Sequence, residues 1–116
     1  MNNERKAAGL GAVSSSGTLA SIAAAHSADQ AAHGTMSHTG SDGSTLGQLL
    51  SRGGFRASGY AENVAAGYGS ADAVMTGWMN SAGHRANVLG NYTQVGVALA
   101  RSASGVSYWN MVLGRP

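Results

Sequence analysis

The chain has 116 residues, of which 43% are hydrophobic and only 10% charged, and its formal net charge is +2. This length suits one domain with a single core, and the seven Lys and Arg residues form no basic run, which argues against a nucleic-acid partner. The absence of cysteine excludes disulfides and Cys-based zinc sites, and no apolar stretch approaches the length of a membrane span.

Apolar periodicity predicts a series of helical segments in the first two thirds of the chain. Residues 2–9 are expected to form a short polar helix, and residues 18–33 a longer amphipathic one. A capping box at residues 45–48 predicts the start of another short helix. Residues 71–80 have the spacing of a further main helix.

The last third of the chain has the alternation of β-strands. Residues 93–99 and 107–113 are expected to form a hairpin, with residues 101–105 as its turn, and residues 60–66 are expected to form an earlier strand. Helices, a strand, a helix and then two strands predict an α+β fold in which helices cover an antiparallel sheet. The domain is expected to span residues 1–116.

The segment 77–89 gathers polar groups around a helix break. Trp78 continues the apolar stripe of the preceding helix, and Ser81-Ala82-Gly83 is expected to interrupt or turn that helix, because glycine supplies backbone freedom there. His84 follows the break directly. It is expected either to point into a cleft or simply to cap a helix end, and the residues alone favour neither.

Two other segments carry groups that suit a site. His38 lies in the polar loop of residues 34–45, and Glu62 lies in a segment that is otherwise apolar or small. Because a buried carboxylate is costly unless it is paired or metal-bound, Glu62 either pairs with an arginine or meets His38 and His84 in a cleft. Two His and one Glu form a known zinc ligand set, but the spacing carries no metal-binding signature and simple His–Glu hydrogen bonding explains the same residues. His26, on an apolar helical stripe, is expected to be structural.

Short motifs at residues 2–5, 9–10, 25–29, 37–40, 62–65, 78–89, 92–97 and 108–109 occur in a fixed order over nearly the whole chain. As an ordered set they resemble the CAP superfamily of cysteine-rich secretory proteins, antigen 5 and plant pathogenesis-related proteins. The similarity is greatest to the short, cysteine-free bacterial branch of that superfamily.

The resemblance implies an α-β-α sandwich, with an antiparallel sheet of three to four strands between helical layers and a cleft on one side. In eukaryotic relatives the cleft holds two His and two acidic residues and can bind a divalent cation. By motif, His38 and Glu62 match one His and one acid of this tetrad. The other acid falls at Ser81 and the other His at Asn91, so the tetrad is incomplete, and His84 is expected to supply the missing imidazole.

The resemblance also implies secretion or display outside the cell, with an export signal removed from this chain. The first functional hypothesis is an extracytoplasmic binding module for a small lipid, a peptide or a cell-wall component. A divalent cation, with zinc as the first candidate, would be held by His38, Glu62 and His84. The cleft is expected to be lined by His38, Glu62, His84, Ser81, Asn80, Asn91 and Tyr92.

Two alternatives remain open from the sequence. The first is a protease-like hydrolase in which Glu62 is the general base, or in which the cleft holds a metal-activated water, with His38 and His84 as catalytic partners. The second is an interaction domain whose cleft residues only tie helices to the sheet.

Overall fold

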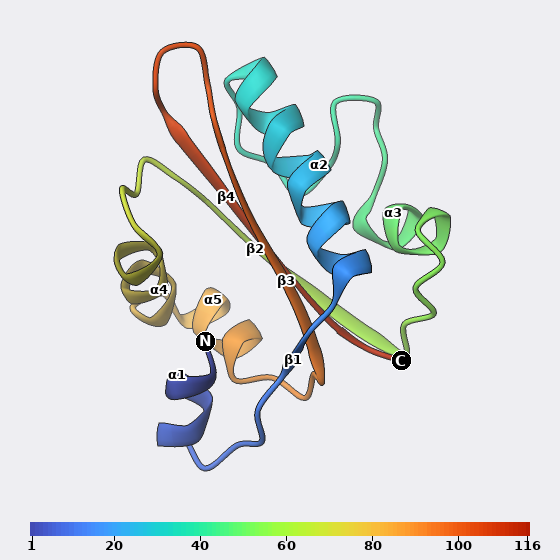
Figure 1. Ribbon diagram of the computed structural model, residues 1–116, viewed down its shortest axis with the longest axis vertical. Helices are drawn as coiled ribbons and strands as arrows, with labels where there is room; N and C mark the ends of the chain where they lie inside the picture. The colour runs from blue at the N-terminus through green and yellow to red at the C-terminus, as the bar shows by residue number, and fades with distance from the viewer.

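The computed structural model describes residues 1–116 as helices arranged around one four-stranded sheet (Figure 1). The elements in chain order are α1 (Asn2–Ala7), β1 (Ser14–Ser15), α2 (Gly17–His33), α3 (Leu46–Arg52), β2 (Gly59–Ala66), α4 (Ala71–Met79), α5 (Ala82–Val88), β3 (Gln94–Arg101) and β4 (Ser107–Arg115). The strand order is β1-β3-β4-β2. Strands β3 and β4 form an antiparallel hairpin, and β2 pairs antiparallel with the other side of β4.

Helices cover both faces of this sheet, with α2 and α3 on one side and α1, α4 and α5 on the other (Figure 1). The central strand β4 is buried from Ser107 to Gly114 because both of its faces are covered. Val112 packs against α2 and α3 in one core cluster, with Leu19, Ile22, Ala23 and Leu50. Met111 and Leu113, which point to the opposite face, pack against α4 and α5 in the other.

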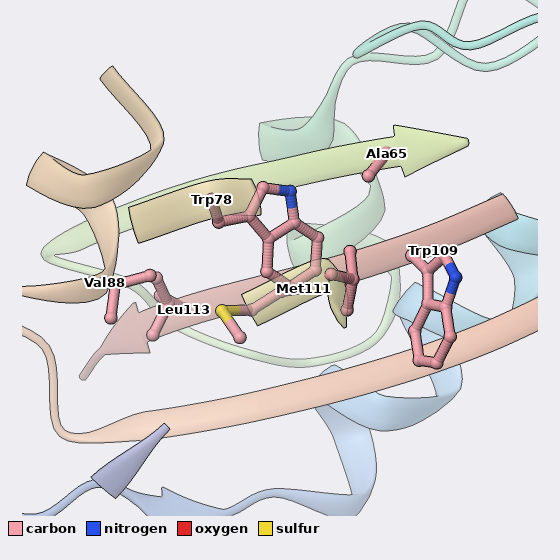
Figure 2. Packing of buried hydrophobic residues seen from close by; sticks show 7 residues of the cluster. Ala65, Trp78, Val88, Trp109, Met111 and Leu113 are labelled. Carbon is pink, nitrogen blue, oxygen red and sulfur yellow. The ribbon is translucent and has the colours of Figure 1, made fainter. Parts of the chain in front are cut away.

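Trp78 of α4 lies at the centre of this second cluster, beside Met111 and between the two helices and the sheet (Figure 2). Its indole N–H donates to the carbonyl oxygen of Val64 in β2, so the ring is both packed and oriented. Val88 of α5 closes the same cluster. The two clusters thus attach all of the main helices to one strand.

The predicted α+β class and the main predicted elements are confirmed, including the helix break at Ser81 and the hairpin at the end of the chain. The predicted all-antiparallel sheet was wrong in one detail, because β1 runs parallel to β3. The N–H groups of Ser14 and Ser16 donate to the carbonyl oxygens of Thr93 and Val95. β1 is only two residues long and both of them are exposed, so no side-chain alternation revealed it. None of the helices combines the length and apolar character needed to cross a membrane.

The first core cluster depends on a close approach of α2 to β3 at Gly96. A Cβ atom added to Gly96 would lie 2.1 Å from the backbone nitrogen of Ala20, a distance that no packed structure tolerates. The obstacle is backbone, so a rotamer change cannot relieve it. The absence of a side chain at this residue therefore fixes how closely the helix lies on the sheet.

We expect Gly96→Ala to lower the free energy of unfolding by about 3 kcal/mol or more, because α2 must shift away from the sheet. Urea unfolding followed by Trp fluorescence measures the change. Gly69→Ala is the matched control, since a Cβ at Gly69 meets nothing within 4 Å. Equal stability of the two variants would contradict the close-packing explanation.

Candidate functional site

The polar loop between α2 and α3 is fastened to α2 by hydrogen bonds. His26 Nε2 lies 2.6 Å from the carbonyl oxygen of Ser37, and the Ser37 N–H donates to Gln30 Oε1 at 3.0 Å. Further along the loop, the N–H and hydroxyl of Ser41 both donate to the carboxylate of Asp29. The three helix residues lie at helical spacing on one face of α2, so a single helix face sets the shape of the loop.

This loop brings His38 to Glu62. His38 Nδ1 lies 2.7 Å from Glu62 Oε1, which is the distance of a charge-assisted hydrogen bond. An ionised carboxylate accepts hydrogen bonds and cannot donate them, so Nδ1 is the donor in this pairing. The other ring nitrogen, Nε2, has no hydrogen-bond partner in the protein. The His38 side chain is 62% exposed, whereas that of Glu62 is 4% exposed. The pair therefore joins a buried carboxylate to an imidazole that faces solvent.

Glu62 is held from the sheet side as well. Asn110 Nδ2 of β4 donates to Glu62 Oε2 at 2.9 Å, and the buried His26 Nε2 lies 4.0 Å from the same oxygen. Glu62 is in register with Val112 of β4, so its carboxylate projects from the face of the sheet that α2 covers. The two hydrogen bonds, from His38 of the loop and Asn110 of β4, explain how a carboxylate is tolerated there, since a buried charge needs partners.

His84 does not join this pair, because α5 packs on the other face of the sheet, where its Val88 belongs to the cluster around Trp78. Asn63, which alternation directs away from Glu62, donates to the backbone carbonyl oxygen of His84 at 3.1 Å. The prediction that His84 replaces the missing imidazole therefore fails on topology: adjacent residues of β2 serve opposite helical layers.

The other predicted cleft residues do not surround the His38–Glu62 pair either. Asn80 and Ser81 flank the junction of α4 and α5, and Asn80 borders a hollow that contains Arg85 but neither His38 nor Glu62. Asn91 is exposed, and its carbonyl oxygen accepts from Arg115. Tyr92 packs over Gly90. The single cleft expected from the motifs is thus divided between two surfaces.

The side chains present do not form a metal centre of three protein ligands. No group of three or more His, Cys, Asp or Glu side chains is placed to hold one metal ion. His38 has one ring nitrogen committed to Glu62, and Glu62 has both oxygens occupied by hydrogen bonds. The divalent cation implied by the family resemblance, with His38, Glu62 and His84 as ligands, therefore lacks a matching donor set.

His26 is the second imidazole near Glu62, and sequence reasoning missed that proximity. The prediction that it is a buried structural residue agrees with its 3% exposure and its bond to the loop. The available signal was its spacing: His26, Asp29 and Gln30 form a polar stripe on a helix otherwise rich in alanine. Such a stripe needs partners, and only the polar loop that follows α2 could supply them.

Comparison with known protein families places this chain in one of them. The family model described as "CAP: Cysteine-rich secretory protein family" matches residues 1–113. The chain belongs to the CAP family. The uncharacterized protein YkwD of Bacillus subtilis (strain 168) is 35% identical over 106 residues, which cover 89% of this chain and 40% of YkwD. This CAP domain thus corresponds to less than half the length of that relative.

Solved structures of bacterial proteins have the same fold. An extracellular protein with an SCP domain from Bacillus anthracis superposes with a TM-score of 0.88 at 29% identity, over 99% of this CAP domain and 37% of that chain. An outer surface protein of Borrelia burgdorferi gives a TM-score of 0.90 at 19% identity, over 98% and 85% of the two chains. The second likeness, at such low identity, concerns the fold alone.

The link between Asp29 and the loop gives an electrostatic prediction. Hydrogen bonds from the Ser41 hydroxyl and then the Ser41 N–H lower the pKa of Asp29 from its ordinary value of 3.8. A lowered pKa in the folded state means that the ionised carboxylate stabilises the fold above pH 3.8, and that this contribution is lost as the pH falls through the folded value.

We expect Asp29→Asn to reduce the free energy of unfolding by about 1 kcal/mol at neutral pH, and the difference from wild type to shrink in acid. Urea unfolding at a series of pH values measures both effects. Ser41→Ala removes the main donor and should reproduce most of the loss. A difference that widens as the pH falls would show that the link has the opposite sign.

Proposed function

We propose that this CAP domain is an extracellular or surface-displayed binding module that recognises a polar ligand, a peptide or a cell-wall component, at the His38–Glu62 pair. The observation that carries the proposal is the exposed imidazole whose Nδ1 is fixed by a buried carboxylate. This bond holds the ring in one orientation and leaves Nε2 facing solvent. Because the ring is already ordered, ligand binding costs little further side-chain entropy.

The surroundings of the pair support a polar ligand over a lipid. The Glu62 carboxylate has polar neighbours: His38 and Asn110 bond to it, and His26 Nε2 lies 4.0 Å away. None of the five principal hollows, which could shelter an alkyl chain, is lined by His38 or Glu62.

One similar structure supports a location outside the cell. The Bacillus anthracis relative, 29% identical to this domain, is an extracellular protein. Peptides and wall polymers are polar ligands that a protein in this location encounters, so they are the two ligand classes considered first.

Co-sedimentation with purified peptidoglycan tests the proposal, with vesicles of neutral phospholipid as the lipid arm. We expect the wild-type domain to sediment with peptidoglycan and not with vesicles, and His38→Ala to lose about tenfold in affinity, the effect of one hydrogen bond to a charged or polar group. His33→Ala is the matched control, because His33 is also exposed and lies on α2. Equal binding by both variants, or binding to vesicles alone, would refute the proposal.

The geometry also favours a specific form of the hydrolase alternative. Glu62 is too enclosed to act as the general base itself, whereas His38 Nε2 is accessible and Glu62 orients the ring, as an acid does behind a catalytic histidine. In this reading Glu62 is a positioning residue and His38 the base. His84 has no role, because it lies in the other helical layer.

If the domain hydrolyses peptides or wall material, we expect His38→Ala to abolish turnover. We expect Glu62→Gln to lower kcat by more than it changes KM, and to alter the pH profile, because the amide no longer fixes the ring in the same way. A panel of fluorogenic peptides and dye-labelled peptidoglycan measures turnover. Unchanged turnover in His38→Ala would eliminate this mechanism.

A further inference from the structure

A second site lies where the chain leaves α3 and enters β2. A hollow of about 510 Å³ opens there, and Leu50, Phe55 and Tyr60 supply its apolar lining. Tyr60 is 48% exposed, so one side of its ring is available to a ligand. Tyr60 and Glu62 project from the same face of β2, but the hollow contains neither Glu62 nor His38. It is therefore distinct from the pair described above.

The walls of the hollow are fixed by the fold. The Phe55 N–H donates to the carbonyl oxygen of Leu50, and the Phe55 ring lies against Gly114, where a Cβ atom would come within 2.7 Å of it. At the other end of the segment, the Ser58 N–H donates to the carbonyl oxygen of Arg115. A segment held at both ends keeps its shape before a ligand arrives, which reduces the ordering that binding requires.

Arg56 is the charged residue of the lining, and its guanidinium makes no hydrogen bond or ion pair within the protein. The nearby Arg52, by contrast, is engaged with Ser44 and Asp42. No carboxylate lines the hollow, so an anionic group bound there would meet a free, fork-shaped donor and no like charge. The hydroxyl groups of Ser51 and Tyr60 are also without protein partners.

We propose that this hollow binds an acidic saccharide. The carboxylate of the sugar pairs with Arg56, its ring packs over Tyr60, and its hydroxyl groups bond to Ser51 and the phenol of Tyr60. An apolar ring face, hydroxyl donors and one cation are the three features that such a ligand requires, and small-molecule sites combine them in this way. Gly47 allows the phenol of Tyr60 to lie against α3, since a Cβ there would sit 2.9 Å from the hydroxyl oxygen.

Titration of the isotopically labelled domain, followed by amide NMR shifts, tests the site with four probes: glucuronate, glucose, benzoate and acetate. We expect glucuronate to shift the amides of Gly54, Arg56 and Tyr60. Glucose and acetate, which lack the charge or the ring, should bind about tenfold more weakly. Arg56→Gln should bring glucuronate binding down to the level of glucose, and Tyr60→Ala should weaken glucose and glucuronate alike.

Arg85→Gln is the matched control, because Arg85 is likewise exposed and its side chain makes no hydrogen bond within the protein. Loss of binding in Arg56→Gln but not in Arg85→Gln supports the site. The assignment is overturned if the two variants behave alike, if benzoate binds more tightly than glucuronate, or if no probe shifts these amides. His38→Ala should leave glucuronate binding unchanged, so failure of the proposed function and failure of this site are distinguishable.

Discussion

The buried carboxylate of Glu62 is the constraint around which this CAP domain arranges its α2 face. Its two oxygens are divided between a loop imidazole and an amide of the central strand, from His38 and Asn110. Without these donors the charge would be strongly destabilising in so enclosed a position. The need to satisfy it therefore ties a long polar loop, one helix and two strands into one structure, and it leaves the imidazole of His38 at the surface in a fixed orientation.

Alternation along β2 explains why glutamate and asparagine occur side by side. Glu62 points to the α2 layer, and Asn63 points to the α5 layer, where it bonds to the His84 carbonyl oxygen and accepts from Asn87 Nδ2. Both residues are buried, so each needs its own partners. One dipeptide thus connects both helical layers to the sheet, and a one-residue shift in register would leave both side chains without partners.

The glycine residues of the sheet allow neighbouring elements to pack closely against it. Gly96 lets α2 lie directly on β3, and Gly114 makes room for the Phe55 ring. Close approach of this kind brings loops of different elements to one face of the sheet. The polar pair at Glu62 and the aromatic hollow at Tyr60 both lie there, two residues apart on β2, so one face of a small domain presents two chemically different surfaces.

The sequence by itself determined the helices, the hairpin and the family, because periodicity, capping residues and ordered motifs are local properties that a linear chain displays. It also indicated that Glu62 needs a partner, since a lone acid in an apolar segment is costly, and it left an arginine or His38 with His84 as the candidates. Only the tertiary structure showed which second imidazole lies near the Glu62 carboxylate. The sequence favoured His84 and suggested only a structural role for His26, but the side of the sheet on which a helix packs depends on long-range contacts such as that of Val88 with the Trp78 cluster. The same contacts placed α5 opposite Glu62 and left His26 beside it.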